Sequence, residues 1–158
     1  MIEGIKAIIF DWARTLYDPD DTKKEFPESE AVLTYCRDKG LRLAVVSLLS
    51  KQYTPDTTVA MRTELIEASP LRKYFEIALV VEENKYKALD EAVARLGFPR
   101  SQILIVDDRT VRGVKYGNHR GHPTVWLQKG KFAGELPDGT TGEPTYTIHK
   151  LGELKNIL

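Results

Sequence analysis

Several polar side chains directly follow apolar runs of the kind that form buried strands. They are Asp11, Ser47 and the adjacent pair Asp107 and Asp108. Two lysines, Lys85 and Lys87, begin the helical pattern that precedes the last of these runs. Carboxylates that converge repel one another and require a cation, and oxygen ligands of this kind suit Mg²⁺. Aspartate, a metal ion, a hydroxyl group and a lysine are the parts that phosphoryl transfer uses.

Apolar runs alternate with helical patterns along the whole chain. Six runs are typical of buried strands, at 5–10, 41–46, 75–81, 103–106, 124–127 and 146–148. Helical patterns lie between them, at 28–39, 57–68 and 86–96, in a short stretch before Gly121, and at 151–158. This alternation favours right-handed crossovers and a parallel sheet covered on both faces. The predicted fold class is α/β, a three-layer α/β/α sandwich with a central parallel sheet, and its ligands are expected at the carboxyl ends of the strands.

Length and charge limit the class of protein further. The chain has 158 residues, which fits one domain, 1–158, with a core of its own. The 23 Lys and Arg balance the 23 Asp and Glu, which argues against a general nucleic-acid or membrane-surface binder. Cys36 is the single cysteine, so an internal disulfide is excluded. The first apolar run is too short for a signal peptide or a membrane span, which predicts a cytoplasmic protein.

Four segments resemble, in order, the motifs of the haloacid dehalogenase (HAD) superfamily of phosphohydrolases. Residues 8–16 resemble the first motif, hhhDxDxTL, and residues 45–47 the second. Lys85, with the helix that ends at Gly97, resembles the third motif, and residues 105–109 resemble the fourth. The resemblance covers nearly the whole chain. It implies a HAD-like Rossmannoid fold, a single catalytic domain, and a magnesium-dependent phosphatase that acts on a phosphorylated substrate.

The resemblance also implies a role for each matched residue. Asp11 would be the nucleophile, which forms an aspartyl-phosphate, and would also ligate Mg²⁺. Ser47 would hydrogen-bond the transferring phosphoryl group, and Lys85 would neutralise charge there, with Lys87 in its place if the register is shifted. The metal site would comprise Asp11, the carbonyl group of Ala13, Asp107 and Asp108. The substrate-binding residues would be Thr15, Ser47 and Arg109.

Ala13 departs from the family pattern. Phosphatases of the family carry a second Asp at this place, which protonates the leaving group and later activates water. Such general acid–base catalysis is typically worth about 10²–10⁴-fold. Three explanations stay open: a leaving group that needs no proton, such as that of an acyl phosphate; an inactivated or naturally silent protein; or a different chemistry. The alternative to a weakened phosphatase is therefore a catalytically silent binding or scaffold protein.

The spacing between the motifs indicates whether the chain has room for a cap domain. Asp11 and Ser47 are separated by 35 residues, and Ser47 and Lys85 by 37. Each interval is used by a helix and a strand, so neither has room for a cap. The chain therefore resembles the capless members, such as the magnesium-dependent phosphatase-1 type. An open site implies a macromolecular substrate, such as a phosphopeptide, a nucleic-acid end or a glycated protein, or a lid from a neighbouring subunit of an oligomer.

Overall fold

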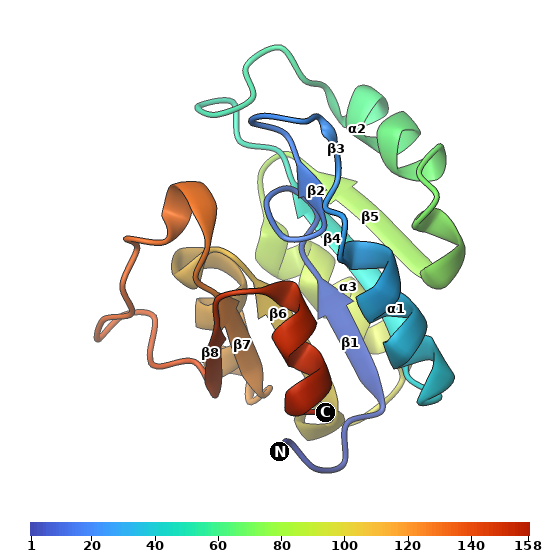
Figure 1. The fold of residues 1–158 in the computed structure, drawn as a ribbon. Coiled ribbons are helices and arrows are strands. Elements are labelled where there is room, and N and C mark those ends of the chain that lie inside the picture. The colour runs from blue at the N-terminus through green and yellow to red at the C-terminus, as the bar shows by residue number, and fades with distance from the viewer.

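The computed structural model describes residues 1–158 and contains a six-stranded sheet between two helical layers (Figure 1). The strand order is β5-β4-β1-β6-β7-β8, and every neighbouring pair is parallel. The strands are β1 Ala7–Phe10, β4 Arg42–Leu48, β5 Ile77–Val81, β6 Ile103–Asp107, β7 Thr124–Leu127 and β8 Tyr146–Ile148. The predicted α/β sandwich with a central parallel sheet is confirmed, and all six predicted strands are present.

Four α-helices connect the strands, together with shorter helical turns. The α-helices are α1 Ser29–Asp38, α2 Val59–Glu67, α3 Lys85–Leu96 and α4 Lys115–Arg120. The 3₁₀ helices are Arg72–Tyr74, Arg100–Gln102, Gly130–Phe132 and Leu151–Asn156, and a π-helical turn spans Thr110–Val114. The segment 151–158, for which the sequence predicts a helix, is therefore a 3₁₀ helix that ends two residues early.

The two faces of the sheet carry separate hydrophobic cores. Side chains alternate along β1, so that Ile8 and Phe10 face one core and Ala7 and Ile9 face the other. The first core is covered by α1, α2 and the C-terminal 3₁₀ helix, which lie on the near side of the sheet in Figure 1. The second core is covered by α3 and α4. The helices therefore form the two outer layers.

The start of α3 is fixed by local hydrogen bonding. The side chain of Asn84 accepts a hydrogen bond from the backbone N–H of Lys87 and caps the helix. The helix ends at Gly97, whose φ of 78° lies in the left-handed region that glycine adopts without strain. Lys85 is thereby held in the first turn, at the carboxyl-end edge of the sheet.

A short antiparallel hairpin, which the sequence patterns do not indicate, follows β1. It pairs β2, Tyr17–Asp18, with β3, Lys24–Glu25. Its turn is closed by the Asp18 carboxylate, which accepts backbone N–H bonds from Asp20, Asp21 and Thr22. Strands of two residues are too short to show an alternating pattern. The hairpin and α1 fill the interval before β4, and α2 fills the interval before β5, so neither interval contains a cap domain.

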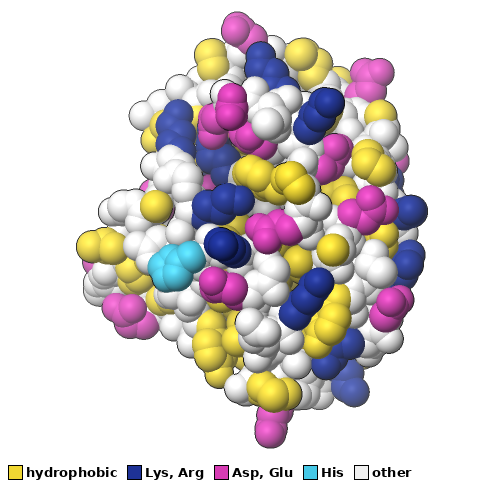
Figure 2. Space-filling model, in the orientation of Figure 1, with side chains coloured by type: hydrophobic (Ala, Val, Ile, Leu, Met, Phe, Trp, Pro, Cys, Tyr) yellow, Lys and Arg dark blue, Asp and Glu magenta, His cyan; other side chains and the backbone are white.

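Charged side chains of both signs are interspersed over the molecular face shown in Figure 2. This distribution agrees with the net charge of zero. None of the helices is long and apolar enough to cross a lipid bilayer.

Candidate active site

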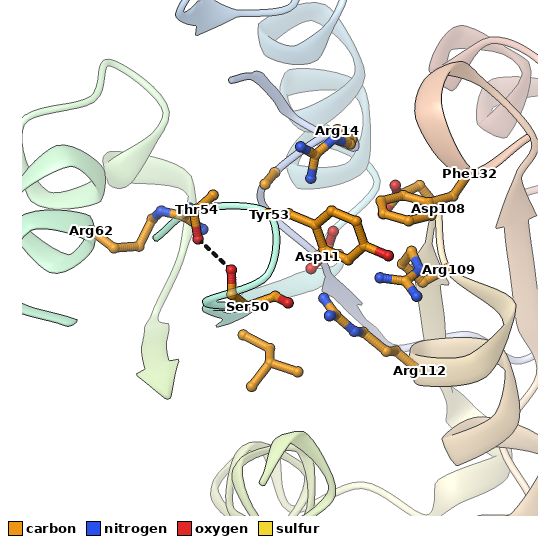
Figure 3. Close-up of a pocket in the computed structure, with 12 residues that line it drawn as sticks. Asp11, Arg14, Ser50, Tyr53, Thr54, Arg62, Asp108, Arg109, Arg112 and Phe132 are labelled. Carbon is orange, nitrogen blue, oxygen red and sulfur yellow. Dashed lines mark hydrogen bonds between the residues drawn. The ribbon is translucent and has the colours of Figure 1, made fainter. Parts of the chain in front are cut away.

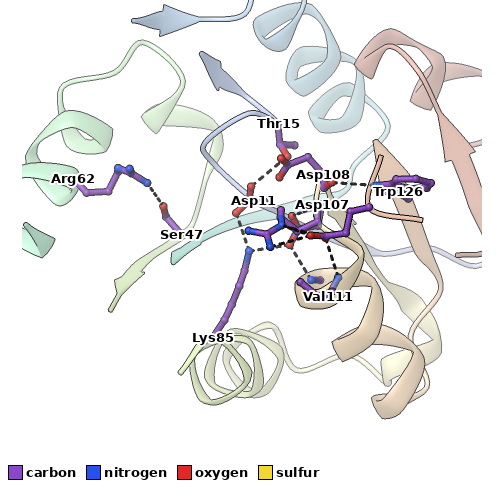
Figure 4. Close-up of polar contacts among 12 residues, drawn as sticks. Asp11, Thr15, Ser47, Arg62, Lys85, Asp107, Asp108, Val111 and Trp126 are labelled. Atoms are coloured by element: carbon purple, nitrogen blue, oxygen red, sulfur yellow. Dashed lines mark hydrogen bonds and ion pairs between the residues drawn. The ribbon is translucent and has the colours of Figure 1, made fainter. Parts of the chain in front are cut away.

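Three aspartates meet at the carboxyl ends of two central strands. Asp11 directly follows β1, Asp107 ends β6, and Asp108 comes next. β1 lies between β4 and β6, where the chain changes the direction in which it adds strands, and such switch points form the binding crevice of open α/β sheets. One carboxylate oxygen from each aspartate lies within 4.8 Å of the others. The sequence-predicted acidic cluster is therefore brought together in space (Figure 4).

Lys85 joins two of these carboxylates. Its Nζ atom lies 2.8 Å from Oδ1 of Asp11 and 2.9 Å from Oδ2 of Asp107. Burial alone would raise the pKa of Asp11, but the charge and hydrogen bond of Lys85 hold that pKa below its usual value. Burial would likewise lower the pKa of Lys85, but Asp107 and Asp11 together raise it. Lys87, the other lysine of this turn, is exposed, so Lys85 is the lysine at the site.

Asp107 is held by backbone donors as well. Its Oδ1 atom accepts the N–H of Arg109 at 3.0 Å, and its Oδ2 atom accepts the N–H of Gly113 at 2.9 Å. Gly113 lies in the π-helical turn, a feature that is frequent at functional sites. A Cβ atom at position 113 would lie 2.5 Å from Oδ2 of Asp107, so only glycine allows this approach. The carboxylate of Asp107 is therefore fixed in place.

Asp108 has the least satisfied carboxylate of the three. Its Oδ2 atom is buried and has no hydrogen-bond partner. Burial, followed by the charges of Asp11 and Asp107, raises the pKa of Asp108 well above its usual value. Its backbone carbonyl accepts the indole N–H of Trp126 at 3.0 Å, which fixes the loop. An unsatisfied carboxylate oxygen beside two further carboxylates is the donor set of a hard divalent cation such as Mg²⁺, so the residues present fit that ion.

Ala13 and Arg14 line a pocket whose wall also includes Asp11 and Asp108. Arg14 has a φ of 67°, in the left-handed region that side chains other than glycine rarely adopt. Its guanidinium group donates to both carboxylate oxygens of Asp20, each at 2.8 Å. Both oxygens of Asp20 are therefore engaged, and Asp20 is not among the residues that line the pocket.

The three residues predicted to bind substrate are all buried, and of these only Arg109 lines the pocket. Thr15 is buried, and its hydroxyl group donates to Oδ2 of Asp11 at 3.4 Å. Ser47 is also buried, and its Oγ atom accepts a hydrogen bond from Nη1 of Arg62 at 2.8 Å. Arg109 lines the pocket, but its guanidinium group pairs with Glu135 and stacks on the Phe132 ring.

Four arginines surround Asp11 in the pocket (Figure 3). They are Arg14, Arg62, Arg109 and Arg112. Ser50, Tyr53, Thr54 and Phe132 complete the polar and aromatic part of the wall. Tyr53 and Phe132 contact each other edge to face, with ring centroids 5.1 Å apart. The pocket therefore combines a few central carboxylates with a surrounding ring of guanidinium groups.

The architecture matches that of solved HAD structures. D,D-heptose 1,7-bisphosphate phosphatase from B. bronchiseptica, solved with magnesium and phosphate, aligns with a TM-score of 0.74 over 97% of both chains at 14% identity. 2-Haloacid dehalogenase from Pseudomonas syringae pv. Tomato aligns with a TM-score of 0.71 over 97% of both chains, also at 14% identity. The chain has a HAD-like fold. The resemblance seen in the sequence motifs is thereby confirmed for the fold.

Comparisons of sequence add two curated relatives. UvrABC system protein C from Legionella pneumophila is 30% identical over 139 residues, which are 82% of this chain and 21% of that protein. The chloroplastic phosphatidylglycerophosphate phosphatase 1 of Chlamydomonas reinhardtii is 27% identical over 144 residues, 89% of this chain and 48% of that protein. The chain thus spans about a fifth and about half the length of these relatives. No family model matches it.

Within the HAD-like fold, the pocket contains residues that the motifs do not identify. Arg62, Arg112, Tyr53 and Phe132 lie outside the four motif segments. The sequence does contain an indication that Arg62 is buried. Arg62 precedes Ile66 by four residues, and both side chains are buried on one face of α2. Phe132 lies in the 3₁₀ helix that follows β7, and no local sequence pattern indicates that this helix lines the pocket.

Proposed function

We propose that this protein is a magnesium-dependent phosphohydrolase that acts through an aspartyl-phosphate on Asp11. The arrangement of Lys85 carries the proposal, because its ammonium group bridges Asp11 and Asp107 beside an unpartnered oxygen of Asp108. The three carboxylates exceed the single ammonium group by two negative charges, which one divalent cation would balance. This is the charge pattern that phosphoryl transfer requires.

The residues present would act as follows. An oxygen of Asp11 attacks the phosphorus atom, and the bond from phosphorus to the leaving group breaks. Lys85 keeps Asp11 ionised and limits its repulsion from the incoming phosphate. The Oγ of Ser47 accepts from Arg62, which leaves its own O–H free to donate to a phosphoryl oxygen. Asp11, Asp107, Asp108 and the carbonyl of Ala13 would hold Mg²⁺, which when bound neutralises charge on the phosphoryl group.

The second step releases Asp11 from its phosphoryl group. Water adds to phosphorus, inorganic phosphate leaves, and Asp11 regains its carboxylate. Ala13 offers no side chain that could accept the proton of this water, so the step is slower than in a protein with an aspartate there. The expected enzyme is therefore active but limited by hydrolysis of its own intermediate.

Hydrolysis of acetyl phosphate and of p-nitrophenyl phosphate tests the proposal. We expect phosphate release with Mg²⁺, none with EDTA, and none from Asp11→Asn, which keeps the shape of the side chain but is not a nucleophile. Asp21→Asn is a matched control, because Asp21 is an exposed residue of the hairpin turn. Phosphate release by Asp11→Asn at the wild-type rate would show that Asp11 is not the nucleophile.

Ala13 also favours a second candidate, a catalytically silent protein that binds phosphorylated molecules at the same pocket. Such a protein would bind Mg²⁺ and phosphate but release no product from either substrate. For both candidates no cap domain lies over the pocket. The absence of a cap suits a macromolecular phosphorylated substrate, or a lid supplied by a second copy of the chain.

A further inference from the structure

We propose that the substrate is a phosphoric anhydride, meaning an acyl phosphate or a diphosphate, whose leaving group departs as an anion without receiving a proton. This inference rests on the proposed phosphohydrolase function and narrows its substrate class. Two independent features carry it. The pocket contains no free carboxylic acid that could protonate a leaving group, and its wall holds two arginines that form no ion pair.

The first feature is the set of acids that line the pocket. The only carboxyl groups among the lining residues are those of Asp11 and Asp108, which serve as nucleophile and metal ligand. The neighbouring carboxylates Asp20 and Glu135 are both engaged in ion pairs with arginines. The remaining O–H group of an aromatic residue belongs to Tyr53, whose ring packs edge to face on Phe132. No carboxylic acid is therefore free to serve the leaving group.

An alcohol leaving group would need such an acid. A carboxylic acid has a pKa near ~4, whereas water, which resembles an alcohol in acidity, has a pKa near ~16. An acyl phosphate or a diphosphate loses a stable carboxylate or phosphate anion, whereas an alkyl phosphate would have to lose an alkoxide. Arginine does not replace the acid, because its guanidinium group keeps its protons at any physiological pH. It does stabilise an oxyanion by hydrogen bonds.

The second feature is the unmatched positive charge. Arg14 pairs with Asp20 and Arg109 pairs with Glu135, but Arg62 and Arg112 have no ion pair. Arg62 is only 4% exposed, and its one side-chain hydrogen bond goes to the neutral hydroxyl of Ser47. Burial lowers the pKa of Arg62, which records the cost of holding this charge away from water. Neither guanidinium group therefore has a carboxylate at ion-pair distance, and the charge they both face is that of Asp11.

Carboxylate and phosphate are the anions that match these groups. The planar fork of a guanidinium donates two parallel hydrogen bonds to either anion. Arg62 and Arg112 both face Asp11 in Figure 3, from opposite walls of the pocket, so groups bound at Asp11 come between them. A leaving group that becomes a carboxylate or phosphate gains charge during the reaction. The two arginines would then bind the transition state more tightly than the ground state.

Both chemical steps use only Asp11, the phosphorylated substrate and water. Oδ of Asp11 forms a bond to phosphorus while the bond from phosphorus to the bridging oxygen breaks. The electron pair stays on that oxygen, which leaves as the carboxylate or phosphate. Water then adds to phosphorus, its proton passes to solvent, and inorganic phosphate and the Asp11 carboxylate are released.

The test compares kcat/KM, measured with Mg²⁺, for acetyl phosphate, pyrophosphate and glycerol phosphate. Ala13→Asp supplies the missing acid, and Ala13→Asn is the matched control of the same shape that cannot donate a carboxyl proton. For the wild type we expect a higher kcat/KM with the better anhydride than with glycerol phosphate. Ala13→Asp should reduce the ratio of these two values by about 10²-fold. Ala13→Asn should leave this ratio within threefold of the wild-type ratio. The anhydride with the greater kcat/KM, acetyl phosphate or pyrophosphate, identifies the class.

Other outcomes separate the two proposals. If wild-type protein hydrolyses glycerol phosphate as fast as the anhydrides, the substrate class is wrong while the phosphohydrolase function stands. If Tyr53→Phe alone removes that glycerol phosphate activity, Tyr53 is the acid, and the substrate class is again wrong. If neither the wild type nor Ala13→Asp hydrolyses any of the three compounds, the proposed function itself is wrong.

Discussion

Nζ of Lys85 lies 2.9 Å from Oδ2 of Asp107, so a buried ion pair joins the first turn of α3 to the end of β6. Lys85→Met keeps the length of the side chain and removes its charge, which leaves two buried carboxylates without their common partner. We expect a loss of about 3 kcal/mol in the free energy of unfolding, measured in urea, and a fall of at least about 10²-fold in kcat/KM. Lys87→Met, on the exposed side of the same turn, should change the free energy of unfolding by less than about 0.5 kcal/mol. Equal effects of the two substitutions would contradict this assignment.

Replacement of Asp108 should separate stability from metal binding. Its carboxylate is buried beside Asp11 and Asp107, and one oxygen has no partner. Asp108→Asn removes the like-charge repulsion, so we expect the variant to be at least as stable as the wild type in EDTA. In Mg²⁺ the wild type should gain in Tm and the variant should gain little, because a metal ligand has been lost. Thermal unfolding with and without Mg²⁺ measures both effects, and an equal gain in the two proteins would place the cation elsewhere.

Ala13 should make the phosphorylated form of the protein accumulate. A good leaving group departs without a proton from a general acid. The water that hydrolyses the aspartyl-phosphate, however, has no general base at position 13 to accept its proton. With acetyl phosphate we expect a burst of product equal to the protein concentration, followed by slow turnover. Intact-mass measurement after acid quenching should detect one added phosphoryl group. Ala13→Asp should reduce the burst, and linear product release from the first turnover in the wild type would count against a slow second step.

Arg14 and Lys23 are the two residues other than glycine with a positive φ, at 67° and 53°. Glycine at either position relieves backbone strain of about 1 kcal/mol. Arg14→Gly also removes the ion pair with Asp20 and one guanidinium of the pocket wall. We therefore expect similar free energies of unfolding for Arg14→Gly and Lys23→Gly, both near or above that of the wild type, but a lowered kcat/KM for Arg14→Gly alone. If both variants lose activity, the effect belongs to the hairpin rather than to the charge of Arg14.

The strands could be predicted from the sequence because each of them contains a short apolar run, and β1, β6 and β7 are buried along their whole length. β7 agrees with its prediction at both ends, and β6 is longer by one residue, Asp107. The hairpin of β2 and β3 could not be predicted, since its two-residue strands are stabilised by the carboxylate of Asp18 rather than by a hydrophobic pattern. The final helix was harder still, because α-helical and 3₁₀ turns of this length present almost the same spacing of apolar residues.

The candidate site could be predicted where residues with reactive side chains come at the end of a strand. Asp11, Asp107 and Asp108 do so, and the structure brings them together. The choice between Lys85 and Lys87 depends on which face of α3 is buried. Leu89, four residues after Lys85, lies on the same face and favours Lys85, but only once the helix is known to pack on the sheet. Ser47 shows the limit of such reasoning. Its place at the end of β4 is as predicted, but its contact with Arg62 depends on how α2 packs on the sheet.

Gly113 lines no part of the pocket, yet its missing side chain lets a backbone N–H reach Asp107. In a saturation library, position 113 should therefore score like a catalytic residue, with alanine already intolerable. A chemist who redesigns this pocket for new substrates can vary the aromatic and arginine wall, but must leave the π-helical turn behind it untouched.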